Sequence, residues 1–213
     1  MNNELQNMRQ DYSSSSLTKA DVLSNPIDQF SAWFNQYSTC AKHDANAMVL
    51  STVGANNRPS SRVVLLKGIS NGGFEFYTNY QSHKAHDISV NNLVSLVFFW
   101  PELERQVRVE GKAEKLSEAE SDAYFKERPR GSKIGAWTSP QSQVVLNRQM
   151  LEDRMAEMEK KFKAEIERPD NWGGYRVVTD SIEFWQGRSN RLHDRIIYIK
   201  GENESWDIKR LAP

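Results

Sequence analysis

Two spacings of apolar residues divide the chain into predicted strands and helices. Between residues 47 and 116, apolar and polar side chains tend to alternate, as in strands that bury one face. Segments such as "GANNRP" and "SNGG" supply turns between the runs. The predicted strands there are "AMVLSTV", "SSRVVLLKGI", "GFEFYTNY", "VSLVFFW" and "RQVRVEGKAEKL", and the pattern returns in "GYRVVTDSIEFWQG", "RIIYIK" and "SWDIKRLA".

Apolar residues three and four positions apart predict helices in the remaining segments. In "SNPIDQFSAWFNQYSTCAK", Ser24 or Asn25 can cap a helix that has Pro26 near its first position. Its apolar face is formed by Ile27, Phe30, Trp33, Phe34 and Tyr37. Further helices are predicted over 82–92, 117–127 and 147–166, the last with an apolar stripe formed by Met150, Leu151, Met155, Met158 and Phe162.

Closely spaced strands with short turns favour an antiparallel sheet curled into a barrel, because closure removes exposed strand edges. The predicted fold class is therefore mainly β with flanking helices (α+β). No repeat or linker divides the chain, so residues 21–213 are predicted to form a single domain. Residues 1–20 are polar, with "SSSS" at 13–16, and are expected to form a mobile tail unless a ligand or partner orders them.

Charge and composition exclude several classes of function. The 213 residues contain 28 Lys and Arg and 28 Asp and Glu, so a general nucleic-acid binder is not expected and a bound anion should be small. No signal peptide and no membrane span is recognisable, and a single cysteine excludes an internal disulfide. A cytoplasmic location is expected. Dinucleotide, P-loop and zinc motifs are absent, and the four histidines are too scattered to suggest a metal site.

The segment "WQGRSNRLHDR" at 185–195 holds three arginines and a histidine with only one carboxylate. In an extended chain Arg191, His193 and Arg195 would project from one face, with Leu192 and Asp194 on the other. Such a face can simply be solvated. With Trp185 and a glycine just upstream, it can instead line a pocket for an anionic or electron-rich ligand.

Three further groups of residues can bind oxyanions. Arg62 and Lys67 of "SRVVLLK" would lie on opposite faces of a regular strand, although both can also be ordinary strand-end residues. In "YTNYQSHKAHDI", Lys84 lies in the first turn of a predicted helix, where free N–H groups favour a phosphate; a tolerated surface lysine is the alternative.

The third group lies in "AYFKERPRGSKIGAW". There Tyr124, Arg128 and Ser132 can meet at one oxyanion in a turn that follows a helix. Alternatively, Tyr124 belongs to the core and Arg128 caps the helix.

These segments together resemble the FMN-dependent pyridoxine (pyridoxamine) 5′-phosphate oxidase family. The resemblance runs from about residue 5 to the end, through "RVVLLK", "FYTNYQSHKAH", "LERQVRVEGKAEKLS", "YFKERPRGSKIGAW", "WGGYRV", "EFWQG", "RLHDR" and "RLAP", in that order. It implies an FMN-binding split barrel and a homodimer with flavin at the subunit interface.

The resemblance also implies roles for single residues. Arg62 and Lys84 would hold the FMN phosphate, with Gln141 and Ser142 contributed by the partner subunit. Further cofactor contacts would come from Val63, Val64, Leu65, Leu66, Lys67, Tyr77, Thr78, His83, Gln106, Trp185 and Arg195. The substrate phosphate would be held by Lys67, Tyr124, Arg128 and Ser132. Arg191 and His193 would be catalytic and face the pyridine ring, with Arg9 and Tyr12 of the tail closing over it as a lid.

The implied reaction converts pyridoxamine or pyridoxine 5′-phosphate to pyridoxal 5′-phosphate by hydride transfer to FMN, with O₂ reduced to H₂O₂. The alternatives are another split-barrel flavin oxidoreductase and a non-catalytic carrier of FMN or pyridoxal phosphate. His83 occupies a position where the family commonly has arginine, so one phosphate contact is expected to titrate near neutral pH. Nothing in the sequence explains Arg188 of "RSN".

Overall fold

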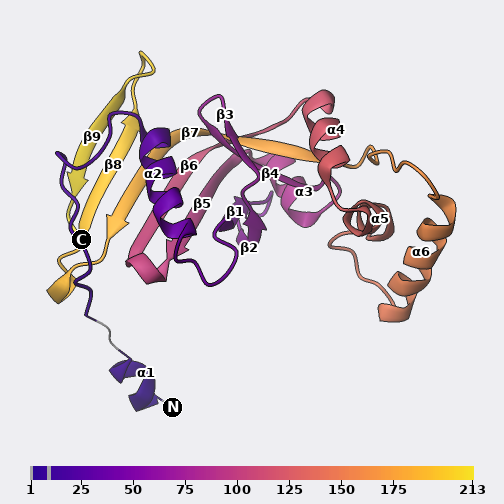
Figure 1. The fold of residues 1–213 in the computed structure, drawn as a ribbon, viewed down its shortest axis with the longest axis horizontal. Helices are drawn as coiled ribbons and strands as arrows, with labels where there is room; N and C mark the ends of the chain where they lie inside the picture. Colours follow the sequence, from indigo (N-terminus) through magenta and orange to yellow (C-terminus); the bar gives the residue numbers. More distant parts are fainter. Residues whose placement is uncertain (1, 9–10) are drawn as a thin grey trace. The chain divides into compact units, whose positions relative to one another are not determined.

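The computed structural model describes residues 2–8 and 11–213. Figure 1 shows its helices and strands. In chain order they are α1 (Asn2–Asn7), α2 (Pro26–Ser38), β1 (Ala47–Val53), β2 (Pro59–Leu65), β3 (Gly68–Ser70), β4 (Gly73–Asn79), α3 (His83–Val90), β5 (Leu93–Trp100), η1 (Pro101–Leu103), β6 (Arg105–Lys115), α4 (Glu118–Glu127), α5 (Arg130–Thr138), α6 (Arg148–Lys161), β7 (Trp172–Gln186), η2 (Ser189–Arg191), β8 (Asp194–Lys200) and β9 (Trp206–Leu211).

The strands form one antiparallel sheet, which confirms the predicted mainly β fold with flanking helices. Its strand order is β2-β1-β5-β6-β7-β4-β3, and β8 pairs with both β7 and β9. The β4–β7 pairing runs from Gly73 opposite Val178 to Asn79 opposite Trp172. In the β7–β8 pairing Trp185 lies opposite Arg195, so the two side chains share a face of the sheet.

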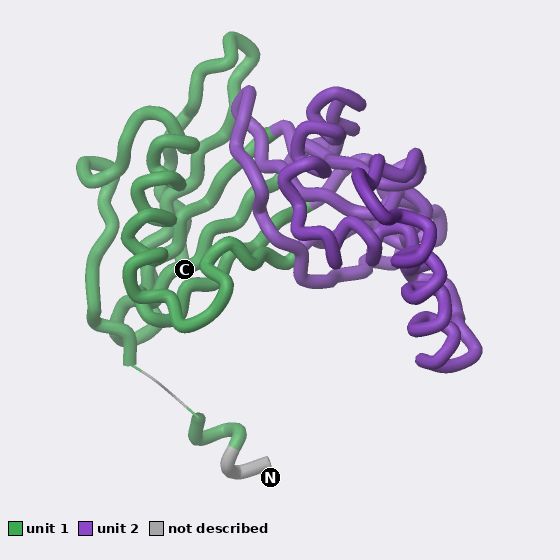
Figure 2. The backbone as a smooth tube through the Cα atoms, turned by 45° about the vertical axis from the view of Figure 1, so that its right-hand side comes forward, with its two compact units in different colours: residues 1–49, 95–110, 179–213 green, residues 50–94, 111–178 purple. Residues whose placement is uncertain are grey.

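The chain forms two compact units, drawn in different colours in Figure 2. Unit 1 comprises residues 1–49, 95–110 and 179–213, and unit 2 comprises residues 50–94 and 111–178. Strands β1, β5, β6 and β7 each begin in one unit and end in the other. The single domain predicted for residues 21–213 remains a prediction.

In unit 1, helix α2 packs against the sheet through its aromatic face. The side chain of Asn25 accepts a hydrogen bond from the N–H of Ile27 (2.8 Å), and Pro26 begins the helix, so its start agrees with the sequence pattern. Phe30 meets Phe98 of β5 with ring centroids 4.9 Å apart, and Trp33 meets Phe184 of β7 at 5.2 Å. These contacts form the part of the unit 1 core that lies between α2 and strands β5 and β7.

The polar N-terminal segment is partly packed against unit 1, rather than being wholly free as its composition suggests. Leu17 is buried, and its N–H donates to the Asp194 carboxylate (3.1 Å). The Ser14 hydroxyl donates to Glu104 (2.8 Å). Because Asp194 also receives hydrogen bonds from Arg188 and Arg210, one carboxylate joins the N-terminal segment to the residue before η2 and to β9.

The core of unit 2 differs from the sequence prediction in one element. The segment after Arg128 was predicted to be a turn, but α5 begins at Arg130, directly after Pro129, whose fixed φ suits a helix start. Ile134 of α5 is buried with Phe125, Ile166 and Trp172. Burial of that apolar residue favours the helix over an open turn despite two glycines within it.

Helix α6 is largely solvated. None of its residues is buried, and Met150 and Met155 are exposed. Met158 and the following Phe162 are partly buried against the unit 2 core. The predicted apolar stripe is therefore only partly covered: Leu151 is also partly buried, whereas Met150 and Met155 are exposed.

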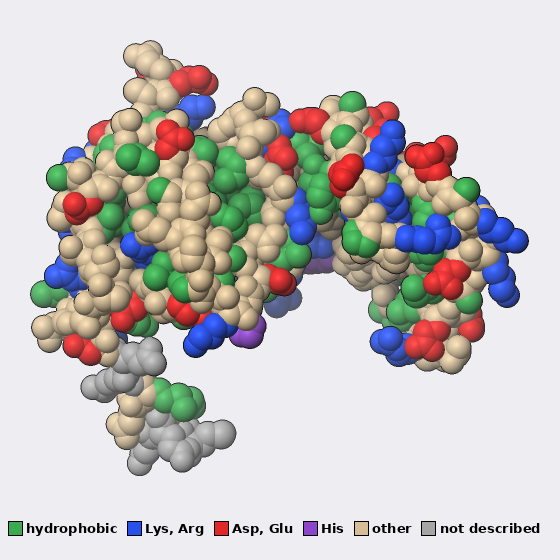
Figure 3. Space-filling view, in the orientation of Figure 1, with side chains coloured by type: hydrophobic (Ala, Val, Ile, Leu, Met, Phe, Trp, Pro, Cys, Tyr) green, Lys and Arg blue, Asp and Glu red, His purple; other side chains and the backbone are tan. Residues whose placement is uncertain are grey.

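Charged side chains of both signs are interspersed on the face shown in Figure 3. This distribution agrees with the equal numbers of acidic and basic residues. Among the described residues, no helix has the length and apolarity needed to cross a bilayer.

Candidate active site

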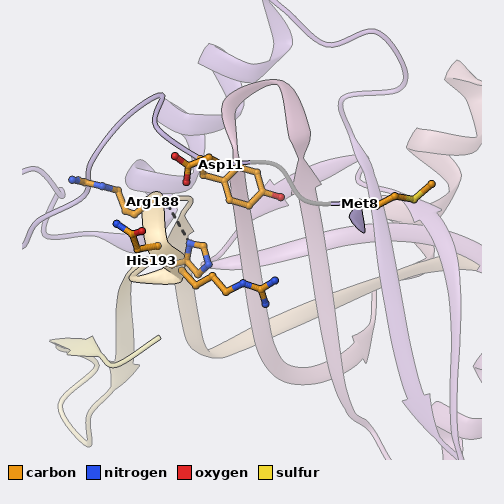
Figure 4. A pocket seen from close by; sticks show the side chains of 7 residues that line it. Met8, Asp11, Arg188 and His193 are labelled. Carbon is orange, nitrogen blue, oxygen red and sulfur yellow. Dashed lines mark hydrogen bonds between the residues drawn. The ribbon is translucent and has the colours of Figure 1, made fainter. Parts of the chain in front are cut away.

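A cavity of about 640 Å³ in unit 1 lies at the turn between β7 and β8. It is lined by Met8, Asp11, Tyr12, Arg188, Asn190, Arg191 and His193 (Figure 4). Asn190 and Arg191 have φ values of 56° and 61°, and strand β8 starts only at Asp194. The prediction that Arg191, His193 and Arg195 alternate along an extended strand is therefore wrong, because η2 replaces the strand at its first position.

The imidazole of His193 is held in a defined orientation. The backbone N–H of Arg188 donates to its Nδ1 (3.1 Å), the contact drawn as a dashed line in Figure 4. The ring also lies 4.6 Å from the Trp185 ring and 5.9 Å from the Tyr12 ring, measured between centroids. Since Nδ1 is an acceptor, neutral His193 carries its proton on Nε2. Arg188, for which the sequence offered no role, thus supplies this backbone donor.

Gly187 allows Tyr12 to reach the site. A Cβ built at Gly187 would lie 2.8 Å from Cβ and Cγ of Tyr12. Tyr12 in turn packs edge-on to Trp185, with ring centroids 5.8 Å apart. Tyr12 is therefore brought to the predicted site, whereas Arg9, its predicted companion, lies outside the described residues.

Arg195 makes an ion pair with Glu183 instead of pointing into the cavity with His193. Its Nε donates to Oε1 of Glu183 (2.7 Å) and its Nη2 donates to Oε2 (3.1 Å). These hydrogen bonds to Glu183 raise the pKa of Arg195. Glu183 was not among the predicted site residues, although its position two before Trp185 on one strand places both side chains on the same face.

A second group of residues, in unit 2, surrounds the Lys84 ammonium. Lys84 Nζ donates to Gln141 Oε1 (2.9 Å) and to Thr78 Oγ1 (3.1 Å), and lies 3.4 Å from Ser82 Oγ. Burial, and then the positive charge of Arg62, lower the pKa of Lys84 to about 8. Ser82 is at the N-cap of α3, yet its side chain makes no capping hydrogen bond. The group offers a partly buried cation and hydroxyls, a donor set suited to a phosphate.

Arg62 is held beside this group by unit 2 itself. Its Nη1 donates to Thr52 Oγ1 (2.8 Å) and its Nη2 donates to the Ser60 hydroxyl. Asp87, which is buried, accepts from Thr52 (2.7 Å) and lies 3.9 Å from Arg62 Nη2. Asp87 was missed by the sequence reasoning. The only signal for it was its place one helical turn after His83 and Lys84.

His83 faces Asp87 rather than the Lys84 group. Its Nδ1 lies 3.5 Å from Asp87 Oδ2, and its side chain is 64% exposed. Gln141 contacts Lys84 within one chain (2.9 Å), and the expectation that Gln141 is contributed by the partner subunit stays a prediction. Ser142 next to it is exposed, with φ of 70°.

A third group, also in unit 2, is an aromatic stack with one arginine. The Tyr77 and Tyr124 rings are stacked with centroids 3.9 Å apart, and Tyr77 lies 5.5 Å from Trp172. The guanidinium carbon of Arg128 lies 4.3 Å from the Trp172 ring centroid. Arg128 Nη1 is buried, and no described residue hydrogen-bonds to it. An unsatisfied buried guanidinium nitrogen is the kind of donor that an oxyanion ligand would complete.

Burial governs the protonation of this third group. It raises the pKa of Tyr77 to about 12 and raises that of Tyr124, so both phenols are hydrogen-bond donors at neutral pH. Burial also lowers the pKa of Arg128. The structure thus brings together Tyr124 and Arg128. Ser132 in the first turn of α5 and Lys67 between β2 and β3 are exposed.

The remaining predicted cofactor residues lie on strands or next to them. Gln106 is on β6 and half-buried; Val63, Val64 and Leu65 are on β2; and Leu66 follows it and is buried. Val63 is exposed. No group of three or more His, Cys, Asp or Glu side chains suited to a metal ion occurs among residues 2–8 and 11–213.

The family models and sequence relatives that match this chain are described as pyridoxine or pyridoxamine 5′-phosphate oxidases. Residues 37–162 match the family model described as pyridoxamine 5′-phosphate oxidase, and residues 172–213 match the pyridoxine 5′-phosphate oxidase C-terminal dimerisation region. The chain is 50% identical over 210 residues to the pyridoxine/pyridoxamine 5′-phosphate oxidase of Cupriavidus pinatubonensis, covering 99% of both proteins. It is 46% identical over 214 residues to that of Trichormus variabilis, covering 100% of both.

Two solved structures have related folds. PhzG from Burkholderia lata 383, in complex with tetrahydrophenazine-1-carboxylic acid, is 27% identical with a TM-score of 0.88, covering 94% of this chain and 100% of that one. An FMN-binding protein related to pyridoxamine 5′-phosphate oxidase, from Nostoc punctiforme, is 17% identical with a TM-score of 0.73, covering 90% and 98%. The second likeness shows the fold alone.

Proposed function

Because the chain belongs to the pyridoxamine 5′-phosphate oxidase family, we propose that it is an FMN-dependent oxidase that converts pyridoxamine 5′-phosphate and pyridoxine 5′-phosphate to pyridoxal 5′-phosphate. The observation that carries this proposal is the partly buried Lys84 ammonium, which lies near Arg62. Among the described residues its hydrogen-bond acceptors are two hydroxyls and an amide oxygen, with no carboxylate. A phosphate monoester supplies the missing negative charge.

In this proposal Arg62 and Lys84 bind the FMN phosphate. Thr78 and Gln141 hold the Lys84 ammonium in place, and Asp87 holds Arg62 through Thr52 and by its charge. Since the proposed phosphate adds negative charge beside two cations, it relieves the repulsion between them. The other proposed cofactor contacts are Val63, Val64, Leu65, Leu66, Lys67, Tyr77, His83, Gln106, Ser142, Trp185 and Arg195.

The substrate phosphate is assigned to the third group. Arg128 offers Nη1, which lacks an acceptor among the described residues, and Tyr124 offers a phenol O–H. Each hydrogen bond to a charged group contributes about 1.5–3 kcal/mol. Lys67 and Ser132 are exposed and complete the proposed grip. This grip distinguishes phosphorylated from unphosphorylated B6 vitamers.

Arg191 and His193 are the proposed catalytic residues. FMN, when bound, would supply the redox chemistry, as acceptor of a hydride from the C4′ carbon of the substrate and donor of two electrons to O₂, which becomes H₂O₂. His193 offers Nε2–H as a donor, because Arg188 occupies Nδ1. Arg191 adds positive charge to the same cavity, and Tyr12 covers it from the N-terminal segment. These residues orient the substrate and reduce its freedom, which is the main contribution the protein can make.

We also propose that the enzyme is a cytoplasmic homodimer with FMN at the subunit interface. Support for the dimer comes from the match of residues 172–213 to a dimerisation region. The single cysteine is compatible with a reducing compartment.

The decisive experiment is an absorption spectrum of the purified, FMN-loaded protein before and after anaerobic addition of pyridoxamine 5′-phosphate. Bleaching of the flavin, followed by recovery of colour and formation of peroxide on admitting air, is expected. Arg191→Ala should lose turnover but keep flavin, whereas Arg62→Ala should lose flavin first. A protein that takes up FMN without bleaching would be a carrier, and one that takes up no FMN would refute the proposal.

The likeness to PhzG favours a second candidate, a flavin oxidoreductase that acts on a carboxylic acid without phosphate. Comparison of pyridoxamine 5′-phosphate with pyridoxamine separates the two. If Arg128 and Tyr124 bind the substrate phosphate, pyridoxamine should bind at least tenfold more weakly than pyridoxamine 5′-phosphate. Arg128→Ala should then abolish this difference in affinity. Equal affinity for both amines would favour the second candidate.

A further inference from the structure

Glu183 lies on β7 at the edge of the candidate active site, two residues before Trp185. It is only 6% exposed. Both of its carboxylate oxygens accept hydrogen bonds from Arg195 (2.7 and 3.1 Å), and Oε2 also lies 3.3 Å from Arg108 Nη1. A buried carboxylate with two guanidinium partners costs free energy to desolvate, so stability alone does not account for its presence.

The geometry fixes Arg195 on three sides. Nε and Nη2 bind Glu183, and Nη1 donates to the carbonyl of Ala212 (2.8 Å). Arg195 also lies opposite Trp185 in the β7–β8 pairing. Its guanidinium therefore has one orientation, and its charge is balanced within the protein.

We propose that Glu183 is a positioning residue that holds Arg195 beside the bound flavin and neutralises its charge, thereby keeping the reduction potential of the flavin low. This inference rests on the proposed function, which places Arg195 against the flavin ring system. A reduced flavin ring carries more negative charge than an oxidised one, so an unbalanced cation nearby would favour reduction. With Glu183 in place, Arg195 would offer hydrogen-bond donors to the ring while adding little net charge.

A low potential suits an oxidase, because the reduced flavin must pass its electrons on to O₂. An unpaired Arg195 would make reduction by substrate easier and reoxidation less favourable by the same free energy. Glu183 therefore sets the balance between the two halves of the proposed reaction. If the ion pair between Glu183 and Arg195 were only structural, its loss would lower stability and flavin content but would leave the reduction potential of the bound flavin unchanged.

The test compares Glu183→Gln with the native holoenzyme. Glutamine keeps the shape and one acceptor oxygen but removes the negative charge. Its midpoint potential, measured anaerobically against reference dyes, should rise by at least a tenfold change in the two-electron equilibrium, which is about 30 mV. Oxygen reoxidation of the reduced variant should slow. Glu110→Gln is the matched control, since Glu110 is an exposed partner of Arg108 and its loss should leave the potential unchanged.

Arg195→Gln is a second variant, for which we expect a shift of the midpoint potential in the opposite direction. It tests the inference even if Glu183→Gln folds poorly. It leaves the Glu183 carboxylate with Arg108 as its remaining partner, so the potential should fall. Bound flavin with an unchanged potential in these variants would overturn the inference. If the native protein binds no FMN, the proposed function fails instead, so the two failures are distinguishable.

Discussion

The backbone N–H of Arg188 binds Nδ1 of His193 at 3.1 Å, and this single contact determines which imidazole nitrogen is free to act on a ligand. His193→Asn keeps an acceptor near the position of Nδ1 but has no group at the position of Nε2. We expect kcat/KM to fall by about 100-fold, the lower range for loss of a general acid–base or donor group. Steady-state kinetics with pyridoxamine 5′-phosphate measure this. Flavin content should be unchanged, and near-native turnover would remove His193 from the proposed mechanism.

The approach of Tyr12 to Gly187 leads to a second prediction. In Gly187→Ala the new methyl group would overlap the Tyr12 side chain, so Tyr12 should move off Trp185 and KM should rise several-fold. In a Tyr12→Gly background the same substitution should cost much less, because both the Cβ and the ring of Tyr12 that obstruct the methyl group are gone. Gly201→Ala is the control, since a Cβ there meets Ser205 at an ordinary 3.4 Å. If the effects of the two substitutions on KM were additive in the double variant, Tyr12 and residue 187 would not be in contact.

The depressed pKa of Lys84 predicts how flavin affinity varies with pH. Without an anion the ammonium loses its proton near pH 8, against 10.5 for an ordinary lysine. Above pH 8, binding of a phosphate must therefore restore a proton, and FMN affinity should fall by up to tenfold per pH unit. Fluorescence titration of apoprotein with FMN between pH 7 and 9.5 measures the slope.

Two variants separate Lys84 from His83 as the cause of this slope. Lys84→Arg should flatten it, because arginine stays protonated throughout the range. His83→Gln can weaken FMN binding as a whole but should leave the slope above pH 8 unchanged, since His83 faces Asp87 rather than Lys84. The stability of the apoprotein should vary with pH in the opposite direction to its FMN affinity. Between pH 8 and 10.5 Lys84 is protonated in the unfolded state but not in the folded state, so its contribution to the free energy of unfolding rises with pH in that window.

The unsatisfied Arg128 guanidinium predicts opposite effects on stability and binding. Arg128→Met removes a buried donor without an acceptor among the described residues and keeps apolar contact with Trp172. The ligand-free protein should be about 1 kcal/mol more stable to urea. KM for pyridoxamine 5′-phosphate should nevertheless rise at least tenfold. A variant that is less stable and binds substrate normally would show that Arg128 is a structural residue.

Much of the fold was readable from the sequence because its strands are regular. "AMVLSTV" coincides with β1, and the cap at Asn25 and the proline after it locate the start of α2. Helix α5 was missed because its two glycines and its preceding proline resemble a turn, and only the burial of Ile134 reveals why a helix forms.

The candidate site was less readable, because its geometry depends on partners distant in sequence. Strand alternation placed Arg191, His193 and Arg195 on one face, but Asn190 and Arg191 have positive φ angles and Arg191 belongs to η2. Strand β8 begins only at Asp194, so Arg195 alone of the three lies on a strand. The carboxylates at Glu183 and Asp87 gave no signal of their own, since acidic residues on strands and helices are usually solvated. Their importance follows from burial and from the arginines that they bind.

Ser82 begins α3 without using its hydroxyl to cap the helix, and the hydroxyl lies instead within reach of Lys84. The first amides of α3 therefore lack this cap, and we expect an anion bound at the helix start to slow their exchange with solvent. Deuterium uptake in this one turn would report occupancy of the proposed phosphate site for any ligand, coloured or not. Deuterium uptake at the start of α3 can therefore be used to screen phosphate-bearing compounds on the unlabelled protein.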